Sequence, residues 1–259
     1  MTAAEPVEPC GNAPRFGARP LSCGGTPGHV WTSWGRSFGE LDVTACPALV
    51  VVAPHPDDET LGFGATMALL AERGVDVQVV SVSDGGAAQG DLTPFDRYRL
   101  ERTRSAELRK AARVLGVGEP ISLGLPDGEL ADHQNAITDL LTGILQARPP
   151  GTWCATTWRG DGHPDHEAVG RAAATAAHRT AAVLLEYPVW MWHWARPGDA
   201  AVPWDRAFTV PLTASAVERK QVAAQTFRSQ FHPLTPGAGP VLPPFVLPRL
   251  LAVGEMVFR

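Results

Sequence analysis

The sequence lacks several features that would place it in a specialised class of protein. Its 259 residues contain no run of about 18 uncharged apolar residues, so we predict no membrane span. Acidic residues outnumber Lys and Arg by 27 to 22, and this excess argues against the clustered cations that a nucleic-acid partner requires. The segment 1–28 has neither the basic start nor the apolar stretch of a secretory signal.

Cysteine is also scarce. The four cysteines form no C-x-x-C pair and are too few to build a disulfide framework in a chain of this length: Cys10, Cys23, Cys46 and Cys154. We therefore expect a cytoplasmic protein with free thiols. A bond between Cys10 and Cys23 stays open as an alternative, because both lie in the same N-terminal segment.

The composition is that of an ordinary globular protein, with 44% apolar and 19% charged residues. A chain of this length forms one large domain or two small ones, and we find no internal repeat. We predict a flexible N-terminal arm at 1–28 and a single domain at 29–259. That domain comprises a core at 48–187 and a cleft-forming C-terminal extension at 188–259. The oligomeric state is left open.

Short apolar runs alternate with longer segments of helical periodicity across the core. We predict five strands, at 48–53, 75–83, 121–123, 153–157 and 182–187. Helices between them are predicted at 60–73, 96–115, about 137–145 and 164–177. This alternation is typical of an α/β protein with a Rossmann-like, mostly parallel sheet flanked by helices.

The C-terminal extension is rich in Trp and Pro. Within it we predict a strand at 207–210, a helix at 215–227, and an ordered loop at 232–248 that can wall a cleft. Three tryptophans would share one face if their segment is extended: Trp190, Trp192 and Trp194. They are either core residues or a surface on which a sugar or an aromatic group stacks.

Polar side chains collect at the points where the predicted strands end. Carboxylates or imidazoles follow four of the strands, in the segments 54–59, 84–86, 126–128 and 161–166. Ligands of open α/β sheets bind outside the carboxyl ends of the strands. Burying such groups costs free energy, so their concentration at one edge favours a functional site.

Two of these segments contain metal-ligand types. His55 precedes three acids at 57–59, whose mutual repulsion a cation would relieve, and His163 and His166 follow the fourth strand. A histidine and a carboxylate from one loop with a histidine from another are typical of a catalytic zinc site with a position open to water. The interpretation requires that strands 48–53 and 153–157 be neighbours. A single His-Pro-Asp turn would ordinarily be a helix cap, and capping is retained as an additional role.

A second motif directly follows the acids. Gly62 and Gly64 begin like the glycine fingerprint of a dinucleotide site, but Met67 occupies the third position of the pattern and the preceding loop is acidic. We therefore expect no NAD or FAD. The glycines are interpreted as sites of close packing between helix and sheet.

The paired motifs resemble the PIG-L family, also called LmbE-like, of zinc-dependent N-acetylglucosaminyl deacetylases. Residues 54–59 look like its [AP]-H-P-D-D-E motif and residues 163–166 like its H-P-D-H motif, within a resemblance that covers about 48–187. The resemblance implies that zinc is bound by His55, Asp58 and His166. It further implies that Asp57 is the general base, that His163 polarises the oxyanion, and that Asp165 orients His163.

Two more positions match the family's substrate-binding pattern, Arg104 in R-x-x-E and Asp127 in P-D-G. Each has a structural alternative: an ion pair of Arg104 with Glu107, and a turn cap at Asp127. Trp190 is the third candidate for substrate binding. The chain departs from some relatives at Asp161, where they have a tyrosine.

We expect a metal-dependent hydrolase that removes the N-acetyl group from a GlcNAc-containing small molecule. Zinc would acidify a water molecule and polarise the amide carbonyl, although His2Asp ligation also admits other divalent metals. The tail resembles actinobacterial members that act on secondary metabolites, in particular teicoplanin-type glycopeptide antibiotic deacetylases. The alternatives are a deacetylase of a small GlcNAc thiol precursor, as in mycothiol-type pathways, and a non-catalytic sugar- or metal-binding module.

Overall fold

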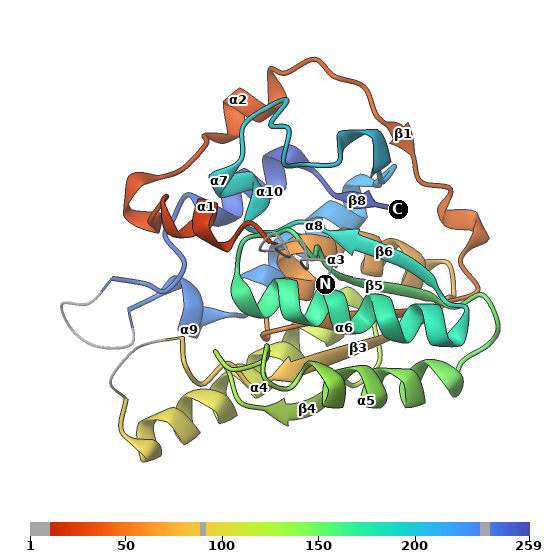
Figure 1. Ribbon diagram of the computed structural model, residues 1–259, viewed down its shortest axis with the longest axis horizontal. Coiled ribbons are helices and arrows are strands. Elements are labelled where there is room, and N and C mark those ends of the chain that lie inside the picture. The colour runs from red at the N-terminus through yellow and green to blue at the C-terminus, as the bar shows by residue number, and fades with distance from the viewer. Residues whose placement is uncertain (1–10, 89–91, 234–238) are drawn as a thin grey trace, which may run out of the picture.

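A mixed eight-stranded sheet with helices on both faces forms the centre of the computed structural model, which describes residues 11–88, 92–233 and 239–259. Its strand order is β1-β7-β8-β6-β5-β2-β3-β4. Five neighbouring strands are parallel: β2 (Ala48–Ala53), β3 (Asp76–Ser83), β4 (Ile121–Leu125), β5 (Trp153–Thr157) and β6 (Val183–Tyr187). The predicted Rossmann-like α/β sheet is confirmed (Figure 1).

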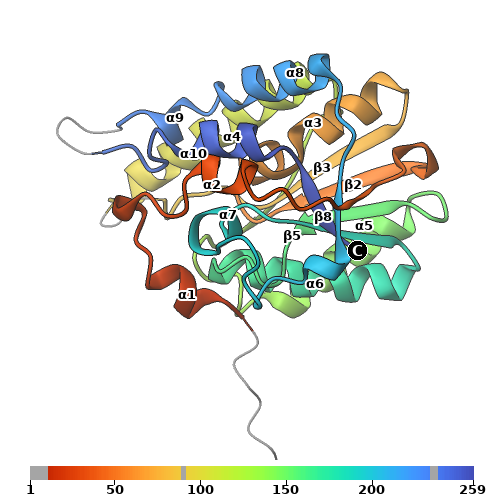
Figure 2. The same ribbon diagram turned by 90° about the horizontal axis from the view of Figure 1, so that it is seen from above.

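Every residue of β2 is buried, as its continuous apolar run predicts for a strand covered on both faces. Val50 and Val52 face the side covered by α5 (Gln134–Gln146) and α6 (Pro164–Thr180). Leu49 and Val51 face the side covered by α3 (Asp58–Glu72), α4 (Pro94–Leu115) and α8 (Ala214–Ala224). These two helical layers lie on opposite sides of the sheet (Figure 2). Leu100 of α4 is buried.

The strand order reverses between β2 and β5. β3 and β4 lie on one side of β2, while β5 and β6 lie on the other, and Val50 of β2 is in register with Cys154 of β5. The loops that follow β2 and β5 therefore lie beside each other at the carboxyl edge of the sheet. The adjacency that the two-loop metal site requires is confirmed.

The C-terminal extension completes the sheet. β7 (Ala207–Thr209) and β8 (Met256–Phe258) pair with each other in antiparallel fashion, and β1 (Gly39–Glu40) pairs with β7. The prediction of a loop throughout 232–248 is wrong at its end, because α10 (Val246–Val253) begins inside it; 234–238 lie outside the described residues. A short helix, α9 (Arg228–Phe231), precedes that stretch.

Residues 11–28 differ from the flexible arm that the sequence predicts. They contain α1 (Ala13–Gly17) and a 3-10 turn at Leu21–Cys23, and α2 (Gly28–Thr32) follows. The Thr26 hydroxyl donates to the carbonyl of Ala195, and the Asn12 side chain donates to the carbonyl of Gly160. These polar contacts hold residues 11–28 against the rest of the domain, and a hydrophobic pattern in the sequence does not predict them. Cys10 lies outside the described residues, so its pairing with Cys23 stays a hypothesis.

Gly62 and Gly64 sit where the packing is close. A side-chain carbon at Gly62 would collide with the ring of Tyr187 in β6, and one at Gly64 would crowd Lys220 of α8. This agrees with the packing interpretation of the two glycines. Within 11–88, 92–233 and 239–259, no helix is long and apolar enough to cross a bilayer.

Candidate active site

A cavity of about 320 Å³ opens at the carboxyl ends of β2 and β5. Seven of the nine predicted site residues line it: His55, Asp57, Asp58, Arg104, Asp127, His163 and Trp190. The other two, Asp165 and His166, are buried and contact His55 and Asp58 respectively. The structure therefore brings together residues that are up to 135 positions apart in the chain, from His55 to Trp190.

His55 has acidic groups on both of its ring nitrogens. Its Nδ1 lies 3.0 Å from Oδ2 of Asp58. Its Nε2 lies 2.9 Å from Oδ1 of Asp127 and 3.2 Å from Oδ2 of Asp165. One nitrogen of the ring thus faces the acid at the start of α3, and the other is held by carboxylates from other loops.

His166 shows the same division between its two nitrogens. Nδ1 lies 2.8 Å from Oδ2 of Asp161. Nε2 lies 3.2 Å from Oδ2 of Asp58, but without the geometry of a hydrogen bond, and it has no hydrogen-bond partner among the described residues. Burial would lower the pKa of His166, but Asp58 and Asp161 outweigh it and raise the pKa to about 9. The surroundings of this ring therefore favour positive charge.

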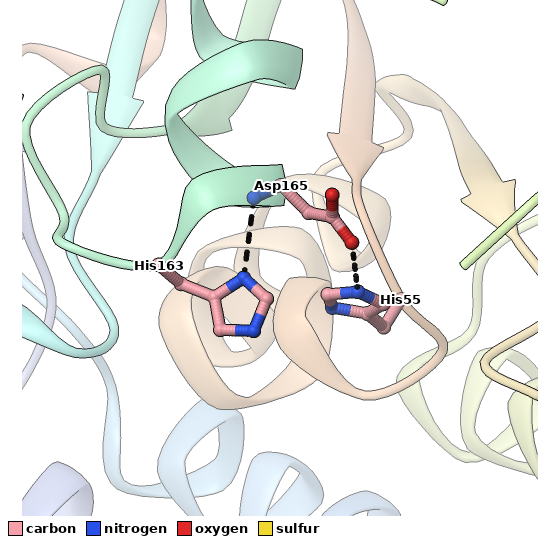
Figure 3. Close-up of side chains that lie close together, drawn as sticks. All are labelled: His55, His163 and Asp165. Atoms are coloured by element: carbon pink, nitrogen blue, oxygen red, sulfur yellow. Dashed lines mark hydrogen bonds and ion pairs between the residues drawn. The ribbon is translucent and has the colours of Figure 1, made fainter. Parts of the chain in front are cut away.

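Among the residues that the structure describes, two groups of side chains could hold a cation, and they share His55. The first is His55, Asp58 and His166, and the second is His55, His163 and Asp165. Figure 3 shows that in the second group Asp165 already holds both rings, through its carboxylate on His55 and its backbone N–H on His163. The first group instead contains the unpartnered Nε2 of His166. Two imidazoles and one carboxylate also suit a zinc site with an open position.

Asp165 contacts His163 through its backbone rather than through its side chain. Its carboxylate accepts from the backbone N–H groups of Gly128 and Leu130 and contacts His55. The contact with His163 comes from the backbone N–H of Asp165, which donates to Nδ1 at 3.3 Å. The sequence could not reveal this, because the competing donors belong to the loop after β4.

His163 is placed to offer a neutral ring to the cavity. Burial, together with the positive charges favoured at His166 and His55, lowers the pKa of His163 to about 3. An imidazolium at this position, one form of the oxyanion-stabilising role, is therefore disfavoured in this state. A neutral ring can still donate one N–H to an oxygen in the cavity.

Asp57 has an unusual backbone and a perturbed carboxyl group. Its φ of 130° is rarely adopted by a residue with a side chain, and Glu59 accepts a hydrogen bond from its backbone N–H. Burial raises the pKa of Asp57 to about 8, although Arg104, 3.4 Å away, acts in the opposite direction. Strain and a raised pKa at one cavity residue are typical of functional sites.

Arg104 is buried beside Asp57, and its predicted alternative partner is wrong. Its guanidinium donates to the carbonyls of Gly85 and Pro56, at 3.0 and 2.8 Å. Glu107 instead accepts from the backbone N–H and the hydroxyl of Ser229. The ion pair fails because α9 supplies a competing donor pair to Glu107. Substrate binding by Arg104 stays a prediction.

The carboxylate of Asp127 contacts residues of other loops, including the proposed ligand His55. Oδ2 accepts from the backbone N–H of Ala87 at 2.7 Å, and Oδ1 contacts His55. The structure thus gives it a role in holding His55, which the sequence did not suggest. Binding of a sugar hydroxyl by Asp127 stays a prediction.

The tryptophan series is helical rather than extended. α7 (Met191–Trp194) begins here because the backbone N–H groups of 189–191 converge on the carboxylate of Asp161. Trp192 and Trp194 are buried in the core, whereas Trp190 lines the cavity with its ring centroid 5.2 Å from that of Phe16.

Outside the core at 48–187, sequence reasoning missed five cavity residues: Phe16, Leu21, Gln230, Val241 and Leu242. None belongs to a motif. The only signal was the general expectation that the C-terminal extension walls a cleft.

Three comparisons with known proteins agree with this geometry. The profile of the PIG-L family, described as GlcNAc-PI de-N-acetylase, matches residues 50–177. The diacetylchitobiose deacetylase of Thermococcus kodakarensis is 30% identical over 125 residues, which cover 47% of this chain and 46% of that protein. The 1D-myo-inositol 2-acetamido-2-deoxy-alpha-D-glucopyranoside deacetylase of Mycobacterium leprae is 36% identical over 175 residues, which cover 56% and 57%.

The chain thus spans about half the length of these curated relatives. Among solved structures, the teicoplanin deacetylase Orf2 in its zinc-inhibited form has a TM-score of 0.58 and 22% identity. The similarity covers 71% of this chain and 85% of that one, and at this identity it concerns the fold.

Proposed function

The chain belongs to the PIG-L family, and from this premise we propose that it hydrolyses the N-acetyl group of a GlcNAc-containing substrate with a divalent cation, preferably zinc, at His55, Asp58 and His166. The observation that carries the proposal is the buried, unpartnered Nε2 of His166, which faces Asp58 and, with Nδ1 of His55, completes a set of three ligand atoms. Both imidazoles have a carboxylate on the opposite nitrogen, as metal-binding histidines usually do.

Zinc, when bound, supplies a Lewis acid that polarises the amide carbonyl and makes a water molecule more acidic. Asp57 accepts the proton of the attacking water and returns it to the leaving amine as the C–N bond breaks. Burial raises the pKa of this carboxyl group toward the working pH, and a group that both accepts and returns a proton works best when its pKa lies near that pH. His163 also lines the cavity and donates an N–H to the developing oxyanion.

Arg104 is the positive charge beside Asp57. Its contacts with the carbonyls of Pro56 and Gly85 fix its position, and it binds substrate oxygen from there. Asp127 accepts from a sugar hydroxyl, and Trp190 packs against the sugar ring. Each of these three residues also has a contact within the protein.

The apolar wall of the cavity bears on the substrate. Leu61, Ala87 and Ala88 contribute from within the family match at 50–177, but most of its apolar residues flank that match: Phe16, Leu21, Trp190, Val241 and Leu242. Such a wall gains free energy by covering an apolar group beyond the sugar. We therefore propose a secondary metabolite with a bulky aglycone, such as a glycopeptide antibiotic pseudoaglycone. A small GlcNAc thiol precursor is the alternative, supported by the similarity to the M. leprae deacetylase.

A substrate panel tests the proposal. The zinc-loaded protein is incubated with GlcNAc, a GlcNAc-inositol, an alkyl GlcNAc glycoside and an antibiotic pseudoaglycone, and deacetylation is scored by loss of mass. We expect turnover of GlcNAc glycosides, fastest with the apolar aglycones. Preference for the inositol would favour the thiol-pathway alternative, whereas no turnover of any substrate would contradict the enzyme.

Asp57→Asn separates the enzyme from a binding module. We expect kcat to fall about 10²- to 10⁴-fold, because the proton acceptor is lost, while zinc affinity stays close to that of the wild type. Asp205→Asn, at an exposed aspartate outside the cavity, is the control and should leave kcat unchanged. Equal activity of all three proteins would mean that Asp57 is not the base.

A further inference from the structure

Asp161 is a buried acid whose accepting capacity is fully used. It lies between β5 and α6, and its exposed fraction is 0%. Oδ1 accepts from the backbone N–H groups of Val189 and Met191, each at 2.9 Å. Oδ2 accepts from the backbone N–H of Trp190 at 2.9 Å and from Nδ1 of His166 at 2.8 Å. A carboxylate offers about four acceptor positions, and all are taken.

The contact with Asp161 determines which nitrogen of His166 carries the proton. A carboxylate only accepts, so Nδ1 is the donor, and in the neutral ring Nε2 keeps its lone pair. Nε2 is the buried atom that faces Asp58 and has no hydrogen-bond partner in the part of the chain that the structure describes. When a cation takes the place of the second proton, the ring therefore presents its electron pair to the proposed cation position.

The same carboxylate also holds the cavity wall. Its three backbone donors are consecutive and form the start of α7, and the carbonyl of Asp161 accepts from Nε1 of Trp194. Trp190, the middle donor, lines the cavity beside Phe16. Any side-chain oxygen that accepts hydrogen bonds could cap this turn. A carboxylate accepts at both of its oxygens, so it can cap the turn and orient His166 at the same time.

We propose that Asp161 is a positioning residue that holds His166 in its metal-binding tautomer and couples that ligand to the cavity wall at Trp190. The inference rests on the proposed function, since it assumes a cation at His166. It assigns a role to the one position where the motif region departs from relatives that have a tyrosine.

Asp161→Asn tests the inference, because an amide can cap the turn but presents an N–H toward His166. That N–H favours the tautomer with the proton on Nε2, which cannot bind a metal through Nε2. Glu167→Gln is the matched control, since Glu167 is a buried acid of the same region that accepts from the backbone N–H groups of Asn12 and Gly162. Zinc dissociation constants are measured by chelator competition, and folding is checked by thermal unfolding.

We expect Asp161→Asn to weaken zinc binding about 10- to 100-fold and Glu167→Gln to leave it within about twofold. In the zinc-loaded wild type, ¹⁵N-edited NMR should show a proton on Nδ1 of His166, and the variant should lose this signal. A folded Asp161→Asn protein with wild-type zinc affinity, or equal weakening in both variants, would overturn the inference alone. A wild-type protein that binds no zinc would instead overturn the proposed function, and the inference with it.

Discussion

The buried histidines of this chain differ in the groups that hold their two nitrogens. His55 contacts a carboxylate with Nε2 and faces Asp58 with Nδ1. His166 contacts a carboxylate with Nδ1 and faces Asp58 with Nε2. His193 has uncharged and positive partners instead: its Nε2 donates to the carbonyl of Arg19, and its Nδ1 accepts from Arg249 at 3.2 Å. The first two rings are therefore set to tolerate positive charge, and the third is set to stay neutral.

His193 gives a prediction about acid stability. Burial, opposed by the Arg19 carbonyl but reinforced by Arg249, lowers its pKa below the usual 6.5. The unfolded chain then binds the extra proton first, so this contribution to the free energy of unfolding is present above pH 6.5 and is lost as pH falls toward the lowered pKa. Arg249 of α10 and Arg19 are the charged residues that contact the ring, and Phe16, Trp190 and Phe245 pack around it.

His193→Gln keeps a donor and an acceptor but cannot be protonated in this range. We expect its free energy of unfolding to fall less than that of the wild type between about pH 7.5 and 5.5, measured by urea titration. His178→Gln, at an exposed histidine of α6, should follow the wild type. Parallel curves for all three proteins would show that His193 does not sense pH.

At the scale of elements, α3 is two helical segments joined at Phe63, whose φ of -142° and ψ of 15° are not helical. Glu255, just before β8, accepts from the backbone N–H groups of Ala65 and Thr66 and so caps the second segment. Lys220 of α8 pairs with the same carboxylate at 2.8 Å, and both side chains are buried. The C-terminal extension thereby braces the helix that begins with Asp58.

Lys220→Met should be strongly destabilising, because it leaves the charge of Glu255 buried without its partner. We expect the free energy of unfolding to drop by about 3 kcal/mol, measured by urea unfolding. Arg179→Met removes an exposed pair with Asp139 and should cost no more than about 1 kcal/mol. Similar losses in the two variants would contradict a bracing role for the buried pair.

The elements that the sequence predicts well are those with strong periodicity or continuous apolar runs. The five core strands lie where predicted to within two residues at each end; in β2 the reason is burial on both faces, which gives a continuous apolar run. β1 and β8 escaped prediction because each has only two or three residues and depends on partners that are distant in sequence. The helical form of 191–194 escaped because its cause is the side chain of Asp161, some 30 residues earlier.

The site was predictable as far as topology alone determines it. His55, Asp58 and His166 come together because β2 and β5 are neighbours, and the motifs follow those strands directly. The partners of Asp165, Asp127 and Glu107 were not predictable, because each acid had several possible donors and only the packed loops select among them.

At the scale of the whole molecule, the proposed metal ligands and most of the apolar cavity wall come from different parts of the chain. All proposed metal ligands lie within the family match at 50–177, whereas most of the apolar cavity wall comes from residues before and after it. The sheet edge supplies a fixed arrangement of polar groups, and the flanking segments close over it (Figure 1). Substrate preference can therefore change through the flanks without altering the ligand set.

The central claim is tested most directly by anomalous diffraction at the zinc edge on crystals grown with one equivalent of zinc. We predict a single peak about 2.0 to 2.2 Å from Nδ1 of His55, a carboxylate oxygen of Asp58 and Nε2 of His166. A peak bound instead by His163 and Asp165, or no peak at the carboxyl edge of β2 and β5, would contradict it.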